Sequence, residues 1–146
     1  MGCGGSLHIT FERIDYVKLK PRQQETYNFQ KVSAVLAEFG YLTIRLSDDW
    51  NGADFIAQHF ETKASLKVQL KGRLTFSKKY RGKDLFICFR DTDEHWYLYP
   101  HDEVLARVLG IGLLAGTDSW DKKGGYDFPY LKPSFKEMLK PYLLEA

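Results

Sequence analysis

An alternating segment near the middle of the chain constrains the fold more than any other feature. In residues 66–72, which read LKVQLKG, apolar and polar side chains alternate strictly. In a β-strand such alternation sends the two sets to opposite faces of the sheet, so that one face can pack on a core. The other face presents Lys67, Gln69 and Lys71, and Asp54 lies fifteen positions before Gln69, a gap long enough for a turn between neighbouring strands. We therefore expect a carboxylate, a carboxamide and ammonium groups to meet on one sheet.

The flanking segments predict a central mixed five-stranded sheet flanked by helices, an α/β (α+β) fold. Apolar residues at three- and four-residue spacing over 22–39, between Pro21 and Gly40, indicate a leading helix. The run 84–90 is apolar almost throughout, which is typical of a central strand buried on both faces. The other predicted elements are a loose edge strand within 7–19, strands at 41–46, 53–60, 64–71 and 95–99, a turn at 47–52, a basic loop at 73–83, a helix at 101–109, an irregular stretch at 110–125 and a final helix at 133–144.

Length and composition indicate one globular domain over residues 1–146. The chain is 44% apolar, and we expect a flexible N-terminus at 1–6, a core at about 22–100 and a C-terminal helical extension at 101–146. No apolar run reaches the roughly 18 residues of a membrane span. Cys3 and Cys88 are the two cysteines, too few for a zinc cage or a disulfide framework, so a reducing cytoplasmic setting is expected.

Charge is distributed unevenly along the chain. Residues 63–83 contain eight basic and no acidic residues, whereas the remainder holds 13 basic against 19 acidic residues. A positive block on an otherwise acidic chain indicates a surface that faces a polyanion, although a solvated lysine-rich loop would give the same composition. The candidate nucleic-acid contacts are Arg73, Lys78, Lys79, Arg81 and Lys83.

The residues at the centre of the pattern suit metal-assisted hydrolysis of a phosphodiester. Such a reaction needs charge neutralisation on the phosphate and a nucleophilic water, and a divalent ion held by oxygen ligands supplies much of both. Asp54 offers a carboxylate, Gln69 a neutral carbonyl oxygen, and Leu70 a main-chain carbonyl oxygen. Lys71 lies on the same strand face as Gln69 and could hold the attacking water or stabilise the growing negative charge.

Asp54 with Gln69-Leu70-Lys71, after a leading helix that carries Glu25, resembles the PD-(D/E)XK nuclease superfamily. This group includes many restriction enzymes, the Holliday-junction resolvases and some homing endonucleases. The resemblance implies a Mg²⁺-dependent DNA endonuclease, with Mn²⁺ as a substitute ion. Under it Asp54, Gln69, Leu70 and Glu25 hold the metal, and Lys71 is the catalytic lysine. Two positions depart from the motif: Ala53 replaces its proline, and Gln69 replaces its second acidic residue.

Other functions remain open from the sequence. A catalytically inactive nuclease-fold module would bind DNA without cutting it, and a structural or protein-interaction domain would have no nucleic-acid affinity. The four histidines lack the spacing of a zinc site, and His101 before Asp102 and Glu103 is interpreted as a helix-capping feature. By analogy with small nucleases, which need two active sites to cut both strands, we allow for a homodimer or a higher homo-oligomer.

Overall fold

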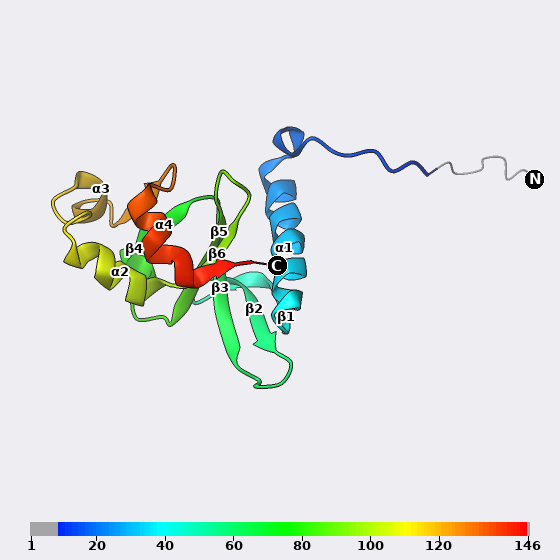
Figure 1. Ribbon diagram of the computed structural model, residues 1–146, viewed down its shortest axis with the longest axis horizontal. Coiled ribbons are helices and arrows are strands. Elements are labelled where there is room, and N and C mark those ends of the chain that lie inside the picture. Colours follow the sequence, from blue (N-terminus) through cyan, green and yellow to red (C-terminus); the bar gives the residue numbers. More distant parts are fainter. Residues whose placement is uncertain (1–8, 146) are drawn as a thin grey trace, which may run out of the picture.

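The computed structural model describes residues 9–145, so the expected flexible segment 1–6 lies outside the described residues. Figure 1 shows a central sheet with α1 on one side and α2, α3 and α4 on the other. In chain order the elements are η1 (Tyr16–Lys18), α1 (Pro21–Glu38), β1 (Tyr41–Trp50), β2 (Ala53–His59), β3 (Ser65–Lys71), β4 (Leu74–Ser77), η2 (Lys78–Tyr80), β5 (Leu85–Arg90), β6 (Trp96–Pro100), α2 (His101–Gly110), α3 (Asp118–Asp121), β7 (Gly125–Phe128), α4 (Pro133–Leu139), η3 (Lys140–Tyr142) and β8 (Leu143–Leu144).

The strands within residues 9–145 form a six-stranded mixed sheet in the order β1-β2-β3-β5-β6-β8, and β4 and β7 form a separate two-stranded sheet. Neighbouring strands of the large sheet pair antiparallel, except that β3 and β5 run parallel. The predicted fold class, a mixed sheet flanked by helices, is confirmed. The two residues of β8 add a sixth strand to the five that were expected.

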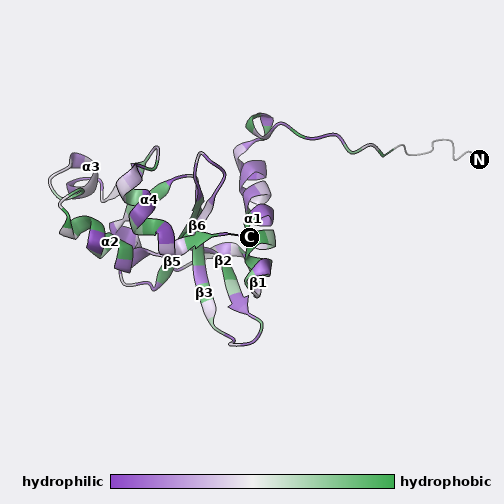
Figure 2. Ribbon diagram, viewed as in Figure 1, coloured by the Kyte–Doolittle hydropathy of each residue, from purple (hydrophilic) through white to green (hydrophobic). Residues whose placement is uncertain are grey.

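Helix α1 packs on one face of the sheet through a narrow apolar stripe. Val32 and Leu36, one turn apart, are fully buried against Phe55 and Val68 of the sheet. The rest of the helix surface is mostly hydrophilic, as Figure 2 shows. Pro21 opens the helix and Gly40, with φ of +83°, follows its end, as predicted. Packing on the sheet therefore fixes the position of this helix.

The opposite face of the β5–β6 half is covered by α2, α4 and the small sheet. Tyr99, Phe76 and Phe89 are among the largest buried side chains there. Strand β5 is buried as expected of a central strand, since Ile87, Cys88 and Phe89 alternate between the two cores and all are at most 2% exposed. Burial raises the pKa of the Cys88 thiol well above its ordinary value, which makes this cysteine an unreactive apolar core residue.

The turn before β2 differs from its prediction. The polar residues 47–50 were predicted to form a turn, but they continue β1, with an irregularity in register between Arg45 and Trp50. The turn itself is the dipeptide Asn51-Gly52, whose φ values of +53° and +88° are both positive. Two such residues between paired strands form a tight hairpin, and Asn-Gly is the sequence that favours it most. This turn delivers Asp54 to the second position of β2.

Three other predictions require correction. The described part of the 7–19 segment is not a strand: residues 9–15 pair with no strand of the sheet, and η1 follows. The basic loop 73–83 contains β4 and η2, because Leu74 and Phe76 alternate into the core and bring β4 against β7. The final helix ends at Leu139 rather than 144, since Pro141 cannot continue a helix.

Membrane-spanning helices are absent from residues 9–145. None of the helices in this range has the length and apolar character needed to cross a bilayer.

The packing of α1 generates a stability prediction. Leu36→Ala should lower the free energy of unfolding by about 2–5 kcal/mol, because it removes a fully buried side chain and leaves a cavity. Leu42→Ala, at a side chain that is 52% exposed, should change it by only about 0.5 kcal/mol. Urea unfolding of both variants measures the difference, and equal losses would contradict the packing described.

Candidate active site

A cleft of about 360 Å³ opens where β2 begins and β3 ends. Its walls come from α1, β1, the first residues of β2, the last residues of β3, and the segment after β4. All the residues predicted to hold metal or to act in catalysis line this one cleft: Glu25, Asp54, Gln69, Leu70 and Lys71. The structure therefore brings together side chains from a helix and two strands that are up to 46 positions apart in the sequence.

Asp54 is held in the cleft by its place in the hairpin and by a hydrogen bond. Its neighbours Ala53 and Phe55 are fully buried, and Phe55 pairs with Val68 of β3. Close to that pair, the Leu70 N–H donates to Asp54 Oδ2 at 2.8 Å. A carboxylate that accepts a main-chain N–H is oriented by that hydrogen bond. The aspartate thus joins the start of β2 to the end of β3.

Gln69 and Lys71 occupy the strand face that was expected for them. Val68 and Leu70 pack with the α1 core, so Gln69 and Lys71 project to the other side, toward the cleft. Lys71 Nζ lies 5.7 Å from the ring centroid of Tyr80, which is itself only 3% exposed. A cation near an aromatic face is attracted by about 0.5–1 kcal/mol or more, so Tyr80 helps to fix the ammonium group.

Glu25 reaches the cleft from α1, together with Arg22 one turn before it. Residues three apart on a helix lie on the same face. Arg45 of β1 also lines the cleft, where its guanidinium donates to Thr26 Oγ1 at 2.8 Å and lies 5.6 Å from the Phe29 ring. Helix and strand together therefore hold one carboxylate and two guanidinium groups at this wall.

The donor set of the cleft fits a hard divalent cation in kind. Within residues 9–145, no three His, Cys, Asp or Glu side chains gather closely enough to hold a metal ion. The cleft offers instead the carboxylates of Glu25 and Asp54 and the carboxamide of Gln69, with the main chain of Leu70 beside them. Oxygen donors of this kind are what Mg²⁺ takes in proteins, usually with several waters retained. These residues are the ones that would hold the ion.

The basic residues predicted from the sequence divide into two groups. Lys79 and Lys83 line the cleft. Arg73 lines a separate small cavity, the Lys78 ammonium lies 5.2 Å from the Trp120 ring, and Arg81 is exposed outside the cleft. Cleft residues that the sequence analysis missed are Arg22, Arg45 and Asp48. Arg22 could have been found, because it lies three positions before Glu25 on the predicted helix.

Comparison with known proteins finds similarity at the level of structure and not of sequence. No protein-family model matches it, and no curated protein matches it in sequence. Among solved structures it is similar to Hjc, a Holliday junction resolvase from the archaeal hyperthermophile Archaeoglobus fulgidus. The two share 14% sequence identity with a TM-score of 0.42, over 53% of this chain and 72% of the resolvase chain.

The hydrogen bond between Asp54 and Leu70 can be tested directly. Asp54→Ala should speed hydrogen exchange of the Leu70 amide by about tenfold or more, since the bond to a charged acceptor is lost. Asp54→Asn keeps an acceptor oxygen and should recover much of the protection. Exchange measured by NMR gives both values. An unchanged rate in the alanine variant would show that this carboxylate does not hold the end of β3.

Proposed function

We propose that this protein is a Mg²⁺-dependent endonuclease that hydrolyses DNA phosphodiester bonds. The observation that carries the proposal is the single cleft lined by Glu25, Asp54, Gln69 and Lys71. Strand alternation and a short motif in the sequence indicate Asp54, Gln69 and Lys71 for one chemistry, and the family resemblance adds Glu25. Their meeting where β2 begins and β3 ends supports that chemistry, because a scattered set could not act on one phosphate.

Each side chain has a part that follows from its position. Asp54, Gln69, the Leu70 carbonyl and Glu25 would hold the ion, which when bound neutralises phosphate charge and makes water a better nucleophile. Lys71 places a positive charge beside these oxygen donors, suited to orienting the attacking water or to stabilising the charge that grows on the phosphate. Tyr80 holds that ammonium at the cleft wall.

The charges around the cleft support DNA as the substrate. Among the side chains that the structure describes, five basic ones line the cleft against three acidic ones. Arg22 and Arg45 come from α1 and β1, whereas Lys79 and Lys83 come from the segment after β4. A backbone that crosses between these walls would meet cations on both sides, and phosphate contacts of this kind position a nucleic acid without reading its sequence. Arg73, Lys78 and Arg81 would extend the contact beyond the cleft.

A second candidate, a DNA-binding module without catalysis, is favoured by one observation. Gln69 brings no charge to a cleft whose described lining includes the carboxylates of Glu25, Asp48 and Asp54. With one negative charge fewer, metal affinity falls. Such a module would bind DNA in a salt-dependent manner and would not cut it with Mg²⁺ or Mn²⁺. Assembly as a homodimer and a cytoplasmic location stay predictions under either candidate.

Substitution of the central residues tests catalysis. Asp54→Ala and Lys71→Ala should each lower Mg²⁺-dependent DNA cleavage by about 100-fold or more, because the first removes a metal ligand and the second a positive charge beside the reacting phosphate. Cleavage of a labelled duplex or junction measures the rate, and circular dichroism checks the fold. Matched controls are Asp118→Ala, in α3, and Lys122→Ala, directly after it, since these two exposed side chains pair at 3.6 Å. Cleavage equal to wild type in both cleft variants would refute the assignment.

The DNA-binding wall is tested by salt dependence. Lys79→Ala and Lys83→Ala should each weaken binding and reduce the slope of log affinity against log salt by about 1, because each phosphate contact releases about one counterion. Arg45→Ala should do the same from the opposite wall. Fluorescence anisotropy with a DNA duplex in metal-free buffer measures the affinity of all three variants as salt is varied. Slopes identical to that of Lys122→Ala would place the DNA elsewhere.

A further inference from the structure

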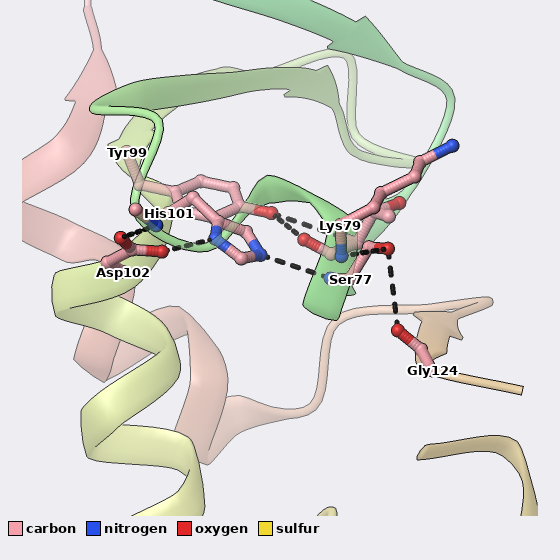
Figure 3. Close-up of polar contacts among 8 residues, drawn as sticks. Ser77, Lys79, Tyr99, His101, Asp102 and Gly124 are labelled. Atoms are coloured by element: carbon pink, nitrogen blue, oxygen red, sulfur yellow. Dashed lines mark hydrogen bonds and ion pairs between the residues drawn. The ribbon is translucent and has the colours of Figure 1, made fainter. Parts of the chain in front are cut away.

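One histidine–aspartate pair holds both ends of the segment between β4 and β5 that lines the cleft. His101, the first residue of α2, is fully buried. Its Nε2 accepts the Ser77 N–H at 3.0 Å, and its Nδ1 lies 2.9 Å from Asp102 Oδ1. The other oxygen of Asp102 accepts the Gly82 N–H at 2.8 Å. Figure 3 shows this chain of bonds running from α2 to the segment 77–82.

These contacts require a neutral imidazole of defined tautomer. Nε2 must carry a lone pair to accept from Ser77, so the ring proton sits on Nδ1 and is donated to Asp102. A protonated imidazole has two donors and cannot accept the Ser77 N–H. His101 is therefore a structural acceptor at the start of η2. Its interpretation as a helix-capping feature was wrong, because the N-cap of α2 is Pro100 and no side chain caps that helix.

The segment held in this way carries side chains of the proposed active site. Lys79 and Tyr80 both line the cleft, and the Tyr80 ring lies edge-on to His101 at 5.5 Å. The same ring contacts the Lys71 ammonium at 5.7 Å and that of Lys79 at 5.2 Å. The Tyr80 ring therefore contacts both His101 and the candidate catalytic residue Lys71.

We propose that His101 is a positioning residue of the cleft: as the neutral Nδ1–H tautomer, it fixes the segment 77–82 so that Lys79 and Tyr80 face the bound DNA. This inference rests on the proposed function for its effect on DNA, whereas the fixing of the segment does not. Protonation of His101 breaks the bond to Ser77 and releases one end of the segment. DNA binding and cleavage then fall as the pH is lowered.

The charged and titratable groups around His101 set the direction of this effect. The groups that act on the ring are Asp102 of α2 and, from the held segment, Arg81 and Tyr80. Burial lowers the pKa of His101 below its usual 6.5, and the hydrogen bond and charge of Asp102 oppose that shift only in part. The folded protein therefore favours the neutral ring. The stabilisation is complete above pH 6.5 and is lost as the pH falls through the lower pKa of the folded state.

Two amide substitutions separate the roles of the ring nitrogens. His101→Gln places an acceptor oxygen near the Nε2 position and should keep the bond to Ser77. His101→Asn can still donate to Asp102 but leaves Ser77 without a partner. Hydrogen exchange of the Ser77 amide should be about tenfold faster in the asparagine variant than in the glutamine variant. kcat/KM for DNA cleavage should fall by a similar factor in the asparagine variant alone.

The pH dependence of DNA affinity adds a further test, because a role of His101 in packing alone would not produce it. Wild-type DNA affinity should drop through a group with a pKa below 6.5, and His101→Gln should lack that step. If neither variant folds, ¹⁵N NMR of the wild-type histidines still decides: the Nδ1–H tautomer, with Ser77 exchange rising as the ring titrates, supports the inference. An Nε2–H tautomer, or equal losses in both variants, overturns it. If the Ser77 amide exchanges as predicted but the protein neither binds nor cuts DNA, the proposed function is refuted. The role of His101 in fixing the segment 77–82 then still stands.

Discussion

The hydrogen bond from the Leu70 N–H to the Asp54 carboxylate is the interaction on which the candidate site depends. Side chains of β2 and β3 alternate, so buried Phe55 and Val68 stand next to polar Asp54 and Gln69. Phe55 and Val68 pack the two strands against α1, whereas Asp54 and Gln69 line the cleft. Because the Asp54 carboxylate links β2 to β3, the polar side chains of the site are held by the same strands that form the apolar core. The same strand pairing therefore stabilises the fold and orients the site.

Much of the fold could be predicted from local patterns, and its irregular parts could not. The period of α1 and the apolar run of β5 predicted the right elements, because burial leaves a regular trace in the sequence. β4 was hidden in the basic stretch, since its apolar residues Leu74 and Phe76 are only two against many charges. The end of β1 was mistaken for a turn because its residues 47–50 are mostly polar, although Asn51-Gly52 carried the stronger signal.

The central residues of the site were predicted from the sequence, but residues at its edges were not. Asp54, Gln69 and Lys71 could be found because strand alternation and a short motif fix their relation. Arg45 and Asp48 could not, since their approach depends on how β1 lies against α1 and continues past its predicted end. The role of His101 was also hidden, because the partner of its ring, the main chain of Ser77, lies 24 positions away. Long-range contacts of this kind leave no local pattern.

We propose that oxygen donors of Asp54, Gln69, Leu70 and Glu25 hold one divalent ion beside Lys71. Anomalous diffraction from crystals grown with Mn²⁺, collected on either side of the manganese absorption edge, tests it most directly. We expect a peak in the anomalous difference map inside the cleft. It should lie within coordination distance, about 2.2 Å, of an Asp54 oxygen and of at least one donor from Gln69, Leu70 or Glu25. A well-diffracting crystal without a peak there at millimolar Mn²⁺, or with the ion bound only elsewhere, would contradict it.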